Sequence, residues 1–182
     1  MKKYFFLFLF FYNFTLLAQS QILKIGPSGL ITTGNNTILN YGIELGGEWK
    51  TSKHWSFGTN GSLFKSAKYE EINFINLKPT KNTLSDEAFG FEPYARRYSE
   101  RFEDGSFWGM GLDIRSLNTR NHSAIFKDTH TYEQYFTLSF GNRTKMTESI
   151  YCDQLLTLGI SGDSPMYFKF CCFLGFGKKL GV

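Results

Sequence analysis

Charged residues recur at alternate positions within several apolar stretches of this 182-residue chain. Residues two or four apart on a β-strand point the same way, so these charges can share one face. Acidic and basic types are similar in number, and buried charges need a partner or water. We predict a structural ion network that sets strand registry, with a proton or small-ion path as the alternative. The predicted network consists of Glu44, Glu48, Glu92, Arg96, Asp113, Arg115, Glu133, Arg143, Asp153 and Lys169.

A second group of reactive side chains gathers between residues 116 and 130. It contains Ser116, His122, Ser123, Asp128 and His130. Serine, histidine and a carboxylate can form a nucleophilic triad, but triads are recognised by geometry and not by proximity in sequence. A polar surface loop explains these residues equally well. The chain has no glycine-rich phosphate loop, nucleophile elbow or metal-binding motif, so we predict no catalytic residue, no cofactor and no metal.

The elements that would position these charges are β-strands. Between Met166 and Phe176 every second residue is large and apolar, and Lys169, Cys171 and Gly175 lie on the opposite face. The stretch 39–49 alternates in the same way. A strand with one apolar face and one face that tolerates charge and glycine is typical of a strand covered by lipid on its outside.

About eight such strands follow one another in a single domain. We predict them at residues 21–31, 39–49, 54–65, 89–98, 107–115, 132–143, 150–160 and 166–176. The first is the least regular, because Gly26, Pro27 and Gly29 interrupt it and proline is expected only at an edge or a bulge. Gln154 is an exception on the apolar face of the seventh.

Connection lengths indicate the topology. The connections near 51–53, 99–104 and 146–148 are short, whereas 66–87 and 117–131 are long. In an up-and-down order the long connections fall at one end, as in an outer-membrane barrel with short periplasmic turns and longer outer loops. The sequence therefore predicts an all-β, antiparallel, up-and-down transmembrane barrel. A soluble barrel remains the alternative, although many glycines share the charged face, where a narrow lumen would need them for space.

The first 20 residues have the pattern of a secretory signal peptide. Lys2 and Lys3 precede an apolar run, and Ala18 and Ser20 are small. We predict a leader over 1–20 and a barrel domain over 21–182. The formal charge of +4 falls further once the leader is removed, which is too little to indicate nucleic acid binding.

Three cysteines are present, at positions 152, 171 and 172. They cannot all pair within one chain, and their spacing matches no zinc site. We interpret them as small apolar residues, with pairing of Cys152 and Cys172 left open.

The segments Phe91–Tyr98 and Phe107–Leu112, rich in glycine and aromatic residues, together with the leader ending at Leu17–Ser20, resemble small eight-stranded outer-membrane barrels of Bacteroidota. The resemblance spans essentially the whole mature chain and implies the OmpA-like type of barrel. It implies a monomer in the outer membrane of a gram-negative bacterium, with membrane lipid, periplasmic chaperones and the barrel-assembly machinery as partners.

We expect a structural or surface-interaction role without catalysis, and a surface ligand would bind the outer segments 66–87 and 117–131. Two alternatives remain: a soluble periplasmic lipocalin-like carrier of an apolar ligand, and a lipid-modifying barrel enzyme with its site at the rim.

Overall fold

The computed structural model describes residues 20–33, 37–75, 78–100, 102–122 and 127–179. Apart from Ser20, the predicted leader lies outside these residues. Within them, no helix is long and apolar enough to cross a membrane. The strands are β1 (Ser20–Thr32), β2 (Ile38–Lys50), β3 (Trp55–Ser66), β4 (Tyr69–Ile75), β5 (Lys78–Tyr98), β6 (Gly105–Asn121), β7 (Thr129–Lys145), β8 (Ile150–Ile160) and β9 (Tyr167–Lys179).

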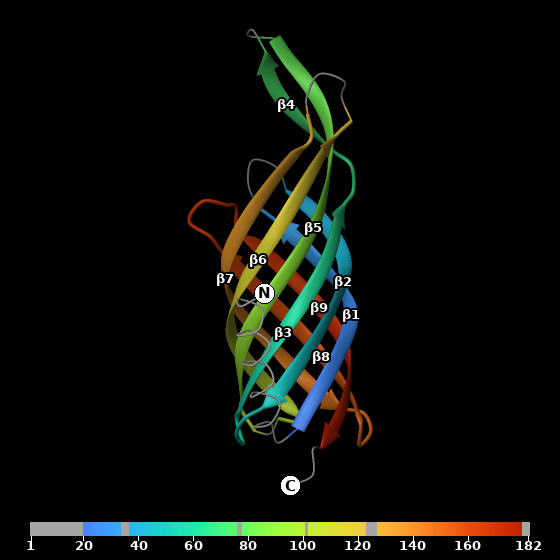
Figure 1. The fold of residues 1–182 in the computed structure, drawn as a ribbon, viewed down its shortest axis with the longest axis vertical. Coiled ribbons are helices and arrows are strands. Elements are labelled where there is room, and N and C mark those ends of the chain that lie inside the picture. Colours follow the sequence, from blue (N-terminus) through green and yellow to red (C-terminus); the bar gives the residue numbers. More distant parts are fainter. Residues whose placement is uncertain (1–19, 34–36, 76–77, 101, 123–126, 180–182) are drawn as a thin grey trace, which may run out of the picture.

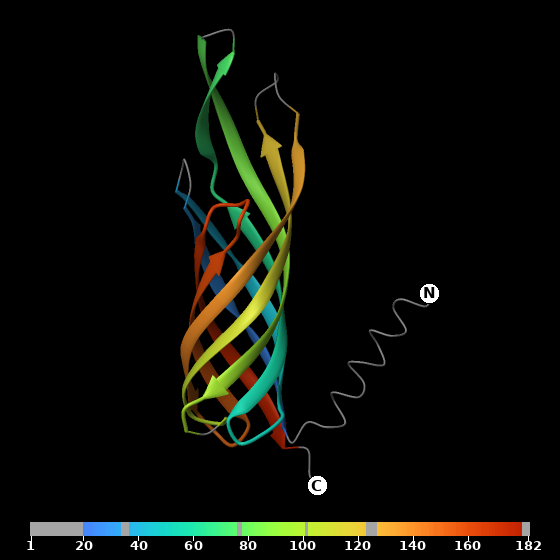
Figure 2. The same ribbon diagram turned by 90° about the vertical axis from the view of Figure 1, so that its left-hand side faces the viewer.

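Eight of these strands close into an antiparallel barrel. The hydrogen-bonded order is β3-β2-β1-β9-β8-β7-β6-β5, and pairing of β3 with β5 completes the ring. Strands that follow one another in sequence are neighbours, with β1 and β9 meeting at the closure between the two ends of the chain. The predicted up-and-down barrel of eight antiparallel strands is thereby confirmed (Figures 1 and 2).

The two long connections are largely strand rather than loop, which corrects the sequence prediction. The segment 66–87 contains β4 and the first part of β5, which pair from Tyr69 with Leu84 to Ile75 with Lys78. In 117–131, β6 continues to Asn121 and β7 begins at Thr129. These extensions rise beyond the barrel at one end, opposite the short turns and the described ends of the chain (Figure 2). That end is the outer one by the loop-length rule.

The first strand is continuous despite Pro27. Its register with β2 runs unbroken from Ser20 paired with Lys50 to Thr32 paired with Ile38. A closed barrel has no edge, so the prediction that this proline needs an edge or a bulge was wrong. The ladder with β9 is interrupted only opposite Gly26 and Pro27, and the same register resumes at Ser28. The missing N–H of proline accounts for that local gap.

The wall of the barrel is apolar outside and polar inside. Leu23, Leu45 and Leu63 point outward and are 57–58% exposed, while Glu48 and Arg143 point inward and are fully buried. This arrangement is the inverse of a lipocalin-like carrier, whose apolar side chains would line the interior. It matches a wall surrounded by lipid.

Two rows of side chains bound the apolar belt. Near the short turns, Trp55, Arg97 and Trp108 are direct cross-strand neighbours on the outer surface. Ten residues further along β3, Lys65 lies opposite Glu87. Ten residues of a strand tilted by roughly 40° span about 25 Å along the barrel axis, the height of the apolar band of such barrels.

Small residues on the inner face leave room for large ones. A Cβ on Gly159 would overlap the ring of Tyr167, and a Cβ on Gly58 would overlap the phenol of Tyr94. Tyr167 and Tyr94 are both buried in the interior of the barrel, the lumen. Inward-facing glycines therefore provide space for side chains that reach across a narrow barrel.

Candidate functional site

The half of the lumen near the short turns is organised around Glu48. Its Oε2 accepts hydrogen bonds from Lys24 Nζ at 2.9 Å, Arg96 Nη1 at 3.0 Å and Arg143 Nη2 at 3.0 Å. Its Oε1 accepts from the hydroxyls of Ser56 and Tyr98. One carboxylate thus joins side chains from β1, β3, β5 and β7.

Asp153 completes this group, which we call the Glu48 cluster: Lys24, Glu48, Arg96, Arg143 and Asp153. Arg143 donates to both oxygens of Asp153 at 2.6 Å, in a bidentate pair. Aromatic rings flank the guanidinium groups, with Arg96 4.3 Å from the Tyr94 centroid and 4.5 Å from that of Phe107. Charge-assisted bonds and cation–π contacts together hold these side chains in one geometry.

The outer half of the lumen carries the Lys169 cluster, which consists of Glu44, Glu92, Asp113, Arg115 and Lys169. Lys169 Nζ lies 2.7 Å from Glu92 Oε2 and 3.3 Å from Glu44 Oε1. Arg115 pairs with Asp113 at 2.6 Å. The groups come from β2, β5, β6 and β9, so this cluster also ties distant strands together.

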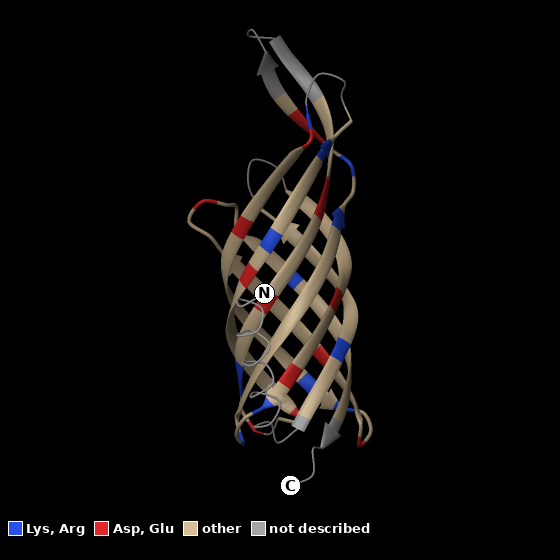
Figure 3. Cartoon of the chain, in the orientation of Figure 1, with Lys and Arg blue, Asp and Glu red and all other residues tan. Residues whose placement is uncertain are grey.

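The two clusters have opposite charge excesses. The Glu48 cluster holds three cations and two carboxylates, and the Lys169 cluster holds two cations and three carboxylates. Together they have no net formal charge. Figure 3 shows this mixture of basic and acidic positions distributed along the strands of the barrel.

Buried apolar side chains share the lumen with the ion pairs. At the end with the short turns, Phe102 folds inward from the β5–β6 turn and is 1% exposed, within a buried cluster that includes Ile22 and Phe173. The backbone oxygen of Phe102 accepts from Arg143 Nη1 at 3.0 Å. At the outer end, Leu30, Phe64, Tyr135 and Tyr167 form a second buried cluster. The lumen is therefore filled by ion pairs and buried apolar side chains together.

Nine of the ten predicted charged residues belong to these two clusters. The tenth, Glu133, lies apart and accepts a hydrogen bond from Tyr135 at 2.8 Å. Sequence reasoning missed Lys24. The available signal was its position between the outward-facing Leu23 and Ile25 on the first strand, where alternation places it on the charged face.

The reactive side chains at the rim do not assemble into a triad. Ser116 Oγ lies 2.9 Å from His130 Nε2, and Ser85 Oγ lies 3.0 Å from His122 Nε2. Asp128 instead accepts from the backbone N–H of Asn121. Within the described residues, no carboxylate is hydrogen-bonded to either imidazole, and no group of three metal-ligating side chains occurs. Ser123 lies outside the described residues.

Asp86 lies just beyond the outer row of the belt and links the extended strands. Its carboxylate accepts from Thr119 at 2.7 Å and from Tyr69 at 3.2 Å, and its backbone N–H donates to Ser66 at 2.7 Å. Burial raises the pKa of Asp86 above its ordinary value. Burial and the nearby Asp86 carboxylate also raise the pKa of Tyr69.

The three cysteines are free thiols in the structure. Cys172 is exposed on the outer surface. Cys171 points inward, where its thiol lies 3.4 Å from Glu44 Oε1. Cys171 and Cys172, which are adjacent in sequence, thus lie on opposite faces of β9.

Comparison with solved structures places this architecture among known barrels. Ail, the attachment invasion locus protein of Yersinia pestis, superimposes with a TM-score of 0.64 at 9% identity, covering 87% of this chain and 98% of Ail. The chain has the fold of the small outer-membrane barrels. No protein-family model matches it, and no curated protein matches its sequence.

Two further barrels support the same fold. OprG from Pseudomonas aeruginosa has a TM-score of 0.64 at 8% identity, covering 88% of this chain and 96% of OprG. Neisserial surface protein A has a TM-score of 0.62 at 6% identity, covering 86% and 96% of the two chains. The OmpA-like type of eight-stranded barrel is therefore supported by structure, at identities that concern the fold alone.

Proposed function

We propose that this protein is an integral outer-membrane barrel with a sealed lumen, whose role is structural or a surface interaction and not catalysis. The observation that carries the proposal is the inversion of the wall, with a lipid-compatible belt outside and interlocked ion pairs inside. An aqueous channel would need a continuous open path, whereas paired charges and buried apolar side chains fill the described part of the lumen.

The outer extensions are the part available to a partner. β4 pairs with β5 alone among the described strands, and a strand at the end of a sheet can take a strand of a partner beside it. Ile72 on β4 and Tyr132 on β7 are 57% and 76% exposed. Exposed apolar groups on the outer extensions favour recognition of a protein partner.

The charge of these segments does not favour a sulfated polyanion. Ail has been solved with the heparin analogue sucrose octasulfate. Segments 66–87 and 117–131 of this chain together contain five basic and five acidic residues. Such a balance gives no electrostatic preference for a highly anionic ligand, so we extend only the barrel scaffold from Ail, and not its ligand.

Delivery and assembly complete the proposal. The leader over 1–20 would direct export, and periplasmic chaperones and the barrel-assembly machinery would insert the chain as a monomer. Affiliation with Bacteroidota and cleavage near Ser20 remain predictions from the sequence.

Fractionation of the full-length expressed protein tests membrane insertion. The outer-membrane fraction should contain the protein, and boiling should change its mobility on a denaturing gel because the closed barrel resists unfolding in detergent. Recovery from the soluble periplasm by osmotic shock would contradict the proposal.

Two experiments test the roles of the lumen and the extensions. Planar bilayers containing the folded protein should stay at baseline conductance, and discrete channel openings would contradict a sealed lumen. For the extensions, residues 67–85 can be replaced by an Asn-Gly turn, which suits a two-residue hairpin. Cells carrying this heat-modifiable variant should lose the surface interactions of the wild type, and unchanged interactions would overturn the surface role.

A further inference from the structure

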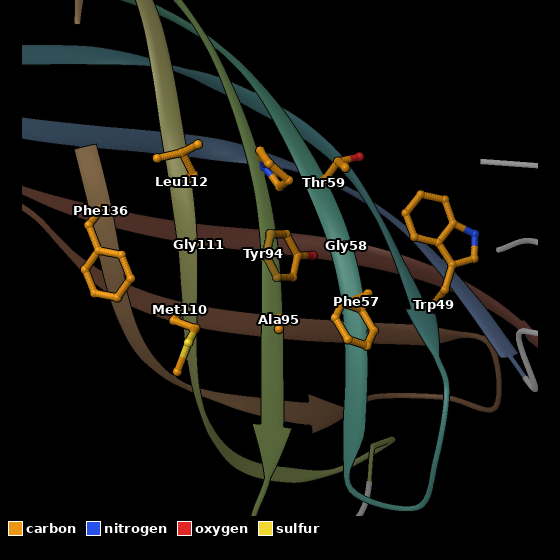
Figure 4. A pocket seen from close by; sticks show the side chains of 11 residues that line it. Trp49, Phe57, Gly58, Thr59, Tyr94, Ala95, Met110, Gly111, Leu112 and Phe136 are labelled. Atoms are coloured by element: carbon orange, nitrogen blue, oxygen red, sulfur yellow. The ribbon is translucent and has the colours of Figure 1, made fainter. Parts of the chain in front are cut away.

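The outer surface has a groove on β5 where two small residues interrupt the apolar belt. Pro93 and Ala95 form its floor, with Phe57 on β3 and Met110 and Leu112 on β6 beside them (Figure 4). Ala95 is paired directly with Phe57 on one side and Met110 on the other. The groove has a volume of about 510 Å³ and is lined mainly by apolar side chains.

A cation lies just beyond this groove, two residues further along β5 toward the short turns. Arg97 follows Pro93 and Ala95 at the next outward-facing position of β5, and it is exposed. Trp55 and Trp108 are its cross-strand neighbours, and their rings approach each other edge-to-face at 6.0 Å. Tryptophan and arginine are residues that favour the boundary between membrane and water.

Arg97 differs from the cations at the opposite boundary. There, Lys65 and Arg120 both pair with Glu87, at 3.4 Å and 2.8 Å. Among the described residues, no carboxylate pairs with Arg97. Its guanidinium group is therefore available to bind an anion from outside the protein, and a phosphate fits its donor geometry.

We propose that this face is a docking site for one phospholipid of the periplasmic leaflet, an inference that rests on the proposed membrane location. The phosphate binds Arg97 beside the packed rings of Trp55 and Trp108, and an acyl chain lies along Pro93 and Ala95. The order of the groups fits a phospholipid, because the cation lies at the membrane boundary and the apolar groove extends from it into the belt.

Native mass spectrometry of the folded, heat-modifiable barrel in detergent micelles, titrated with phosphatidylglycerol, tests the site. The wild type should retain one lipid. Arg97→Gln removes the cation and Ala95→Leu fills the groove, and each should reduce lipid retention by about tenfold, the effect of losing one strong contact. Diacylglycerol lacks the phosphate. The wild type should therefore retain diacylglycerol as weakly as the Arg97→Gln variant retains phosphatidylglycerol.

Two matched variants serve as controls. Lys145→Gln removes an exposed cation at the same end of the barrel, and Thr144→Leu enlarges an exposed side chain away from the groove. Both should retain the lipid as the wild type does. Equal lipid retention by Arg97→Gln and the two controls would overturn the site. A wild-type dimer that Ala95→Leu disrupts would also overturn it, because a second copy of the chain would then cover the groove.

The same preparation separates this inference from the proposed function. A wild-type protein that is soluble and not heat-modifiable overturns both. A heat-modifiable membrane barrel that retains no phosphatidylglycerol overturns the docking site alone.

Discussion

The Glu48 cluster and the Lys169 cluster both hold buried charged side chains in the lumen, but they have opposite excesses of charge. In the first, Glu48 is shared by Lys24, Arg96 and Arg143. In the second, the single ammonium of Lys169 is shared by Glu44 and Glu92. Each cluster therefore depends most on the minority-charge residue that several partners share, Glu48 in the first and Lys169 in the second. The comparison indicates that the number of oppositely charged partners of a side chain, and not its burial alone, decides how much it contributes to the stability of the barrel.

Removal of the Glu48 charge should have the largest effect. Glu48→Gln leaves three buried cations with Asp153 as their one carboxylate, and breaking a buried pair from one side costs about 3–5 kcal/mol. Urea unfolding of the barrel in phospholipid vesicles should show this loss. Glu133→Gln, outside both clusters, serves as the control and should cost about 1 kcal/mol or less. Equal losses would contradict the central role of Glu48.

Substitution of the two lysines sharpens the comparison. Lys169→Met leaves Arg115 as the one cation among three carboxylates, whereas Lys24→Met leaves two cations and two carboxylates in balance. Unfolding measured in the same vesicles should show Lys169→Met to be less stable than Lys24→Met by about 2 kcal/mol. If Lys24→Met were the less stable variant, the charge excess of a cluster would not determine the loss of stability that a substitution causes.

A methyl group tests the space between the inward-facing side chains. Gly159→Ala places a Cβ against the ring of Tyr167, which donates to Asp113 at 2.6 Å, so we expect a loss of about 1–3 kcal/mol in the free energy of unfolding. Gly29→Ala is the matched control, since its Cβ would meet no atom within 4 Å. Similar effects of the two substitutions in vesicle unfolding would exclude tight packing at Gly159.

The smallest effect concerns Asp86, outside the membrane belt. Because burial raises its pKa in the folded state, the fold favours the protonated carboxyl; this contribution is present below the unfolded pKa and is lost as pH rises through the folded pKa. Protease cleavage of the outer strands should therefore become faster relative to Asp86→Asn as pH rises above the ordinary titration range of an aspartate. A constant ratio of the two cleavage rates would refute this assignment.

The sequence predicts the barrel well where lipid imposes alternation. Within the belt, the contrast between Leu45 outside and Glu44 inside is visible in the order of residues. Beyond the belt no lipid requires an apolar face, so alternation weakens and β4 was predicted as loop. Only the pairing of β4 with β5, which residue alternation does not reveal, identifies this segment as a strand.

Two parts of the lumen were less predictable. Lys24 was overlooked because the nearby Gly26 and Pro27 obscured the strand pattern. Phe102 lies in a turn, and its backbone oxygen accepts a hydrogen bond from Arg143, which is 41 residues away. Sequence periodicity carries no information about such a contact.

The most direct test of the inverted wall uses the native fluorescence of the protein. All three tryptophans, Trp49, Trp55 and Trp108, lie on the outer surface near the boundary with the short turns. In vesicles containing phospholipids brominated close to the headgroup, their emission should be strongly quenched, and bromines at the chain ends should quench less. Emission that brominated lipids leave unchanged while aqueous iodide quenches it would contradict a lipid-facing wall.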